Sequence, residues 1–190
     1  MRTWKLKMLE ESIVEHCAPT LAGIKAGSLF SYRWRDRAGM YRSIGEFNRR
    51  YVPRGVCLLP LKIIEGYALL YLFRPHRLMN SLNNSIAISI LSREGYDYSN
   101  ENKCIMKLIS RIKSGKDFPH EIGLFLSYPP EDVEGFIENH AKRCKCSGYW
   151  KVYGDEAKAK REFERIKLCR QIYKKHWESG FGLDRLAIAV

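Results

Sequence analysis

Residues 56–73 read Val-Cys-Leu-Leu-Pro-Leu-Lys-Ile-Ile-Glu-Gly-Tyr-Ala-Leu-Leu-Tyr-Leu-Phe, and this stretch contains the clearest signal for a β-sheet. An apolar run from Val56 to Ile63 is followed by the turn candidate Glu65-Gly66 and by a second apolar run from Tyr67 to Phe73. Two runs of strand-forming residues around a short turn are typical of a β-hairpin. The stretch therefore predicts two paired strands in the middle of the fold.

Helical patterns lie on both sides of this hairpin. Apolar residues near helical spacing predict a helix from Trp4 to Glu15. Pro19 predicts the start of a second helix, which runs to about Tyr32, because proline is favoured at the first helical position. The last residues, 183–190, are interpreted as a short strand or a packed tail. Further helices are expected over about 43–51, 77–93, 100–113, 129–139 and 155–177, and further strands over 121–128 and 149–153.

This order of elements predicts an α+β fold, with a small antiparallel or mixed sheet of about four strands packed with several α-helices. The length of 190 residues suits a single domain over residues 1–190, and a hydrophobic fraction of 45% is enough for a core. No apolar stretch reaches the roughly 18–20 residues that a membrane helix needs, and the charged N-terminus lacks the pattern of a secretion signal. We therefore expect a cytoplasmic protein with no membrane contact.

The net charge of +12 is concentrated near the two ends of the chain. Residues 1–54 carry +6 and residues 142–175 carry +8, whereas residues 55–141 carry −1. If the two basic segments meet in space, they form one basic face that suits an acidic protein, a nucleic acid or an anionic ligand. The alternative is a basic surface that only keeps the protein soluble.

Cations and aromatic rings alternate in the basic segments. Single-stranded nucleic acid suits this combination, because bases stack on rings while cations meet phosphates. An acidic protein would meet the same surface by charge complementarity, and a solvated face with its rings in the core is the structural alternative. The candidate binding residues are Arg33, Trp34, Arg35, Arg49, Arg50, Lys151, Lys158, Arg161 and Arg165.

Cys17 and His120 form a candidate thiol site. Cys17 comes just before the helix start expected at Pro19, where the positive end of the helix dipole would lower the pKa of the thiol. A thiolate is a competent nucleophile, and His120 stands at the entry to a predicted strand, where it could serve as the base. The structural alternative is that Cys17 packs at a helix start and His120 makes a hydrogen bond at a strand edge.

His140, Cys144 and Cys146 form a candidate metal site. Their spacing could supply three ligands to zinc or iron, and a fourth ligand would have to come through the fold. The alternative is a basic loop with incidental thiols. Without a secretion signal, all six cysteines are expected to be reduced.

Four segments are distinctive in combination. They are His16-Cys-Ala-Pro-Thr-Leu-Ala-Gly23, Phe118-Pro-His-Glu-Ile-Gly-Leu-Phe-Leu126, Tyr128-Pro-Pro-Glu-Asp-Val133 and Cys146-Ser-Gly-Tyr-Trp-Lys-Val-Tyr-Gly-Asp155. Together they resemble one bacterial family of unknown function, numbered 3793, over about residues 10–175. The family has no established activity to carry over. The resemblance implies an association with iron uptake and flavodoxins.

Three hypotheses for the function follow from these patterns. The leading one is an accessory or adaptor protein that binds an acidic partner through a basic face, with a flavodoxin-like redox protein as the partner that the resemblance suggests and iron or redox physiology as its setting. The alternatives are a thiol-dependent enzyme that uses Cys17 and His120, and a nucleic-acid-binding protein. The residues name no cofactor, and they leave open whether the protein is an enzyme.

Overall fold

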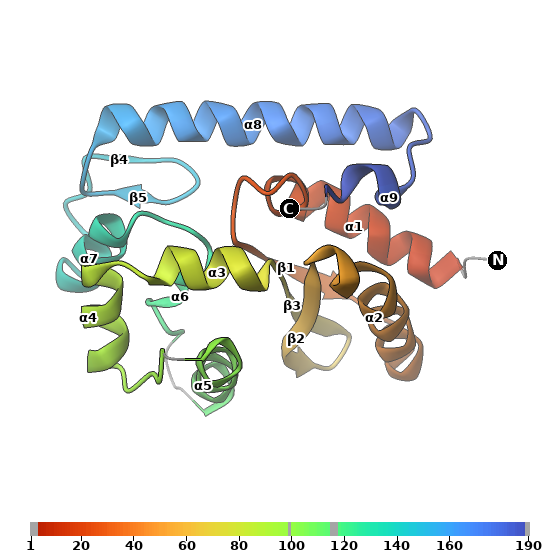
Figure 1. Cartoon of the computed structure of the whole chain (residues 1–190), viewed down its shortest axis with the longest axis horizontal. Helices are drawn as coiled ribbons and strands as arrows, with labels where there is room; N and C mark the ends of the chain where they lie inside the picture. The colour runs from red at the N-terminus through yellow and green to blue at the C-terminus, as the bar shows by residue number, and fades with distance from the viewer. Residues whose placement is uncertain (1–3, 99, 115–117, 189–190) are drawn as a thin grey trace. The chain divides into compact units, whose positions relative to one another are not determined.

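The computed structural model describes residues 4–98, 100–114 and 118–188 (Figure 1). The chain forms two compact units. Unit 1 contains residues 1–76 and 168–190, and unit 2 contains residues 77–167. The expectation of a single domain stays a prediction. The fold is α+β, as the order of elements predicted. None of the described helices is both long and apolar enough to cross a membrane.

The predicted hairpin is confirmed, and it supplies the central strand and one edge strand of the sheet in unit 1. Strands β2 (Cys57–Ile64) and β3 (Tyr67–Phe73) pair antiparallel around Gly66, which adopts a left-handed φ of +75° in the turn. Strand β1 (Gly27–Arg33) pairs antiparallel with the other edge of β3. The strand order is therefore β1-β3-β2. Residues Leu70 to Phe73 are buried in succession, so side chains on both faces of β3 are covered, and this explains why the strand is such a continuous apolar run.

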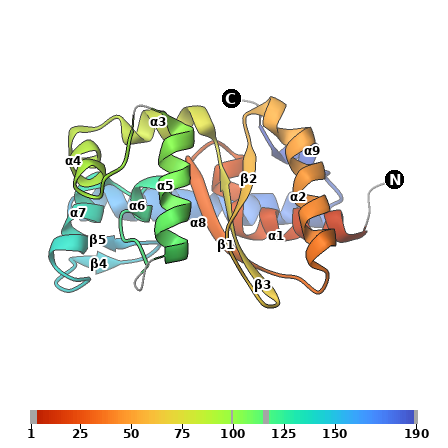
Figure 2. The ribbon, with the colours of Figure 1, turned by 90° about the horizontal axis from the view of Figure 1, so that it is seen from below.

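Helices α1 (Trp4–Leu21) and α2 (Arg37–Tyr51) contact each other and the sheet (Figure 2). Their apolar faces supply buried residues such as Leu9, Ile13 and Phe47 to the core of unit 1. A short 3-10 helix, η1 (Val52–Arg54), leads from α2 to β2. The end of the long helix α8 (Glu156–Glu178) and the short helix α9 (Leu183–Leu186) complete this core.

The helix predicted over Pro19 to Tyr32 is wrong. Pro19 lies inside the last turns of α1, and the residues beyond Gly23, which has a left-handed φ of +68°, lead into β1. Proline has no N–H, so it leaves the carbonyl of Glu15, four residues earlier, without its helical donor. The Arg170 guanidinium of α8 donates to this carbonyl at 3.1 Å. A donor from a distant part of the chain thus replaces the one that the proline lacks.

Unit 2 is mostly helical. The predicted helix over 77–93 is two helices, because the Asn84 side chain accepts from the N–H groups of Ile86 and Ala87 and caps a new helix. Two helices contain residues of both units. The first two residues of α3 (Pro75–Leu82) and the last part of α8 belong to unit 1. The helices are α3 (Pro75–Leu82), α4 (Ser85–Arg93), α5 (Glu101–Ser114), α6 (Ile122–Phe125), α7 (Pro130–Glu138) and the first part of α8.

The strand predicted over residues 121–128 is wrong, because Ile122–Phe125 form the short helix α6. A short apolar run looks the same whether it is a buried strand or a buried helical turn, so its periodicity could not separate the two. The strand predicted over 149–153 is confirmed only at β5 (Lys151–Val152), which pairs with β4 (Cys146–Ser147). The segment 183–190, interpreted as a short strand or a packed tail, begins with the helix α9, so the strand is wrong, and Leu183 and Leu186 pack into the core. Residues 189–190 lie outside the described part of the chain.

Candidate functional site

A groove of about 540 Å³ in unit 1 contains three of the predicted binding residues, Arg33, Trp34 and Arg35. It lies where the first turns of α1, the end of β1 and the start of α2 meet. The side chains of Trp4 and Met8 on α1 are 67% and 48% exposed, which is unusual for such large apolar groups. The apolar part of the lining is Trp4, Met8, Tyr32, Trp34 and Met40.

The end of the hairpin positions the Arg33–Arg35 segment. The N–H of Trp34 donates to the carbonyl of Gly66 at 2.9 Å, so the turn of the hairpin holds the segment in place. Tyr32 and Trp34 pack partly against the core, whereas Arg33 and Arg35 are exposed. This alternation follows from the extended backbone, in which successive side chains point to opposite faces.

The charges in the groove are unevenly paired. Lys5 donates to Asp36 at 2.6 Å, and this hydrogen bond lowers the pKa of the Asp36 carboxyl to about 2. The Arg33 guanidinium donates to the Tyr67 hydroxyl at 2.6 and 3.0 Å. Among the described residues, neither Arg33 nor Arg35 has an acidic partner. The one carboxylate in the lining is therefore neutralised, while two arginines keep positive charge available.

Trp34 adds a further unpaired donor. Its indole N–H is shielded from solvent and has no hydrogen-bond partner in the described part of the chain. A shielded donor without an acceptor costs free energy, on the order of 1–3 kcal/mol. The groove thus combines one exposed ring, that of Trp4, with two half-buried rings and positive charge.

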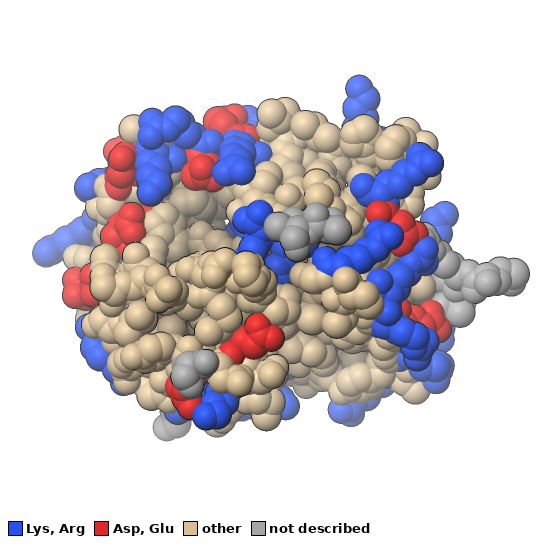
Figure 3. All heavy atoms as spheres, viewed as in Figure 1, with Lys and Arg blue, Asp and Glu red and all other residues tan. Residues whose placement is uncertain are grey.

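The two other predicted binding residues of unit 1 have different surroundings. Arg50 forms an ion pair with Asp184, which also accepts from the Tyr51 hydroxyl at 3.1 Å, so Arg50 holds α9 against α2. Arg49 is exposed in the last turn of α2. Lys and Arg side chains gather over α2 and α9 on the face of unit 1 seen in Figure 3.

The remaining predicted binding residues belong to unit 2. Lys158, Arg161 and Arg165 are exposed on α8, and Arg165 lies 3.5 Å from Glu162 one turn away. Lys151 donates to the carbonyl of Ala141 at 2.6 Å. Because the nine residues are divided between two units, the continuous basic face stays a prediction. Unit 1 has 17 Lys and Arg against 8 Asp and Glu, or +9, whereas unit 2 has 16 against 13, or +3.

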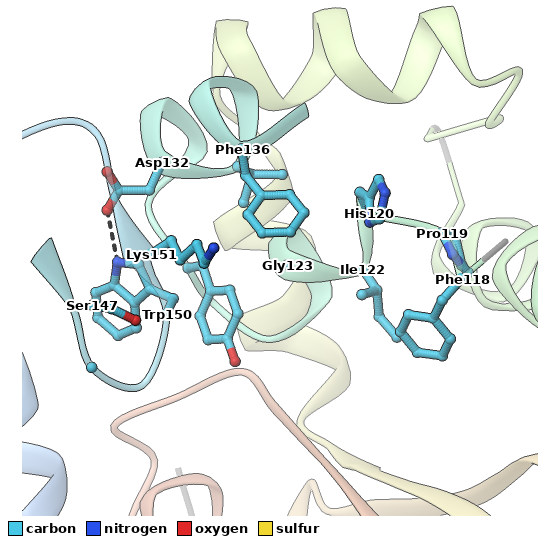
Figure 4. A pocket seen from close by; sticks show the side chains of 13 residues that line it. Phe118, Pro119, His120, Ile122, Gly123, Asp132, Phe136, Ser147, Trp150 and Lys151 are labelled. Carbon is cyan, nitrogen blue, oxygen red and sulfur yellow. Dashed lines mark hydrogen bonds between the residues drawn. The ribbon is translucent and has the colours of Figure 1, made fainter. Parts of the chain in front are cut away.

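A second concave site, a pocket of about 290 Å³, lies entirely in unit 2. Phe118 and His120 line one side and Trp150 and Lys151 the other, with Phe136 between them (Figure 4). His120 meets the Phe136 ring edge-on, with the ring centroids 5.1 Å apart. Three of the four segments that carried the family resemblance contribute to this lining.

Asp132 holds the wall of this pocket that contains Trp150. The buried Asp132 carboxylate accepts from the Trp150 indole N–H and from the backbone N–H groups of Tyr153 and Gly154, each at 2.7 Å. The Trp150 ring is packed edge-on against Phe163, with the centroids 4.5 Å apart. Asp132 lies in the first turn of α7, which corresponds to the helix predicted over 129–139. Its three bonds show that it also fixes the β4–β5 hairpin.

The expected basis for a reactive Cys17 is absent from its surroundings. Cys17 lies near the end of α1 and is fully buried, and burial raises the pKa of its thiol well above the ordinary range. The predicted helix start that would have lowered this pKa does not exist, because α1 runs through Pro19. His120 is exposed in unit 2, just before α6, and not at a strand. The pairing of Cys17 in unit 1 with His120 in unit 2 stays a prediction.

The connection between α7 and β4 contains His140 and Cys144, and Cys146 is the first residue of β4. The connection turns tightly, with left-handed φ angles of +48° to +62° at His140, Ala141 and Arg143. Both cysteines are partly buried free thiols. Among the described residues, no group of three or more His, Cys, Asp or Glu side chains is arranged to hold a metal ion. The structure therefore does not bring these three residues together as a ligand set.

A family model described as Protein of unknown function (DUF3793) matches residues 13–187. The match covers nearly the whole chain, and the protein belongs to this family. The resemblance inferred from the four segments is thus confirmed. No curated protein and no solved structure gives a match.

Some residues of the two sites were not predicted. Trp4 and Met8 lie in the helix expected over Trp4 to Glu15, where nothing marked them as a binding surface, and Met40 lies before the helix expected over about 43–51. Only the meeting of α1 with β1 and α2 brings these residues into one groove. Phe118 and Phe136 come from two separated segments of the chain. The available signal was the aromatic content of the family-like segments, which could have suggested a pocket but not its composition.

Proposed function

We propose that this protein is a non-catalytic binding protein that takes an acidic segment of a partner protein in the groove of unit 1. The observation that carries this proposal is the pair Arg33 and Arg35, which have no acidic partner among the described residues and lie in a groove lined by the exposed ring of Trp4 and the half-buried rings of Tyr32 and Trp34. Charge complementarity of this kind steers association and selects acidic partners. The net charge of +9 on unit 1 acts in the same direction.

The apolar lining favours a protein partner over a nucleic acid. Met8, which is 48% exposed, is a flexible, polarisable side chain that adapts to irregular apolar surfaces, and methionine, aromatic residues and arginine are enriched in protein interfaces. The expected partner segment carries carboxylates for the arginines and at least one aromatic or aliphatic side chain for the groove. A flavodoxin-like redox protein, which the family resemblance suggests, is an acidic protein of this type.

Binding of a defined acidic probe tests the proposal. The probe is a random copolymer of glutamate and tyrosine, titrated into the full chain by calorimetry at low and moderate salt. The groove variant is the double substitution Arg33→Gln and Arg35→Gln. The charge-matched control is Lys158→Gln with Arg161→Gln on α8, outside the groove.

We expect the groove variant to bind at least about 10-fold more weakly, because each arginine near an acidic partner contributes on the order of 1 kcal/mol at partly exposed positions. The control should change binding by less than about threefold. Equal losses in the two variants would show that diffuse charge is responsible and would overturn the proposal. Tighter binding of an oligothymidylate than of the copolymer would favour the nucleic-acid hypothesis instead.

A further inference from the structure

The pocket of unit 2 is separate from the groove and carries an independent inference. Its volume of about 290 Å³ is at the lower end of the range for small-molecule sites. A cavity of about 150 Å³ accepts one benzene ring, so this pocket has room for about two fused rings. Its lining is mainly apolar and aromatic, as is usual where a ligand is held by flat contacts.

The frame of the pocket is held by close contacts. Asp132 fixes Trp150 through the indole N–H, and Phe163 supports the same ring from another side. Gly148 is a residue of the lining where a Cβ atom would come within 2.3 Å of the Phe163 ring. The β4–β5 hairpin and α8 therefore pack as closely as glycine allows, and the walls of the pocket are formed before any ligand binds. Preformed walls reduce the ordering cost of binding.

Basic groups are placed on both sides of the aromatic lining. Figure 4 shows His120 on one side of Phe136 and Lys151 on the other. Lys151 donates one hydrogen bond, to the carbonyl of Ala141, and an ammonium group has three donors. The one carboxylate of the lining, Asp132, already accepts three hydrogen bonds. The free polar capacity of the pocket therefore suits an anion.

We propose that this pocket binds a small planar aromatic acid, whose ring system lies against Phe136 and the neighbouring rings and whose carboxylate meets Lys151. A ligand of this class fills the apolar volume of the pocket and also pairs with the positive charge of Lys151. A neutral ring compound of the same size would use only the first, and a simple inorganic anion only the second.

The probe for the test is 2-naphthoate, and its neutral counterpart is 2-naphthalenemethanol. Both are titrated into the full chain by ligand-observed NMR and calorimetry. Lys151→Gln removes the charge and keeps a donor for the Ala141 carbonyl. The matched control is Lys145→Gln, because Lys145 lies beside the same hairpin and also donates to a backbone carbonyl, that of Gly154, but does not line the pocket.

We expect the naphthoate to bind the wild-type chain at least fivefold more tightly than the alcohol does. Lys151→Gln should weaken naphthoate binding about 5–10-fold and alcohol binding less than twofold, since a charge-assisted hydrogen bond is roughly twice as strong as a neutral one. Lys145→Gln should leave both unchanged. Phe118→Ala removes a ring that is 48% exposed, so the fold should tolerate it, and it should weaken both ligands about threefold or more.

Three results would overturn the proposal. The first is no binding of 2-naphthoate at millimolar concentration. The second is equal binding of acid and alcohol, which would remove the role of Lys151. The third is loss of naphthoate binding in the Arg33→Gln and Arg35→Gln variant, which would place the ligand in the groove of unit 1. Because the copolymer test uses other residues, failure of either proposal leaves the other measurable.

Discussion

Replacement of Asp132 by alanine removes the acceptor that connects α7 to the β4–β5 hairpin. The carboxylate is buried and accepts from the Trp150 indole N–H and from two backbone N–H groups, all at 2.7 Å. Alanine leaves all three donors without this partner. We expect Asp132→Ala to destabilise the fold and to disorder the wall of the unit 2 pocket.

The size of the effect follows from the burial of each donor. A hydrogen bond to a charged group contributes about 1.5–3 kcal/mol when its loss leaves a buried donor. The bond from Trp150 is buried, whereas the two backbone bonds are only partly buried, so their donors can turn to water. About 2 kcal/mol for the indole and about 0.5 kcal/mol for each backbone donor give a loss of about 3 kcal/mol.

Urea unfolding followed by circular dichroism measures this loss. With a slope of about 2 kcal/mol per molar urea, the midpoint should fall by about 1.5 M. Glu138→Ala is the control, because Glu138 is exposed on the same helix, and it should change stability by less than about 0.5 kcal/mol. A loss below about 1 kcal/mol for Asp132→Ala, or the same loss in the control, would refute the role assigned to these hydrogen bonds.

Three further predictions concern unit 1 and the thiols. Iodoacetamide near pH 7.5 should label Cys144 and Cys146 before Cys17, because Cys17 is fully buried and the pKa of its thiol is raised. Mass spectrometry of the native protein after increasing labelling times measures this order. Early labelling of Cys17 would restore the thiol-enzyme hypothesis. Burial raises the pKa of Cys104 from 9.0 to about 11, so between pH 9 and 11 the unfolded chain holds fewer protons than the folded one, and the free energy of unfolding falls as pH rises. In Cys104→Ala, the free energy of unfolding should fall less steeply over this pH range, as measured by urea unfolding at several pH values. An identical dependence on pH in the variant and the wild-type chain would contradict this cause. Arg170→Met removes the donor to the Glu15 carbonyl and should cost about 1 kcal/mol in urea unfolding, whereas Lys174→Met, an exposed change on the same helix, should cost less than about 0.5 kcal/mol.

The sheet was predictable where the signal was local. The hairpin of residues 56–73 carries its own turn and both of its strands, so a short window of sequence contains the whole unit. The helix expected from Pro19 failed for the opposite reason. The donor to the Glu15 carbonyl, which Pro19 leaves without its helical partner, is Arg170, more than 150 residues away, and no local pattern contains that contact.

The candidate sites show the same division. Arg33, Trp34 and Arg35 are consecutive, so their mixture of charge and rings was visible in the sequence, and they line the groove. Trp4 and Met8 lie in the helix expected over Trp4 to Glu15, and no local pattern marked them as part of a site, because only the tertiary arrangement places them in the groove. The thiol argument for Cys17 depended on a helix boundary, which is among the least reliable features to predict, and it lost its premise with that boundary.

Indole NMR signals give the most direct test of the groove as a binding site for acidic protein segments. The chain has four tryptophans, of which Trp4 and Trp34 line the groove. Addition of the glutamate–tyrosine copolymer should shift the indole N–H signals of Trp4 and Trp34 and leave those of Trp150 and Trp177 in place. Shifts confined to Trp150 or Trp177, or no shift at concentrations where calorimetry detects binding, would contradict the account.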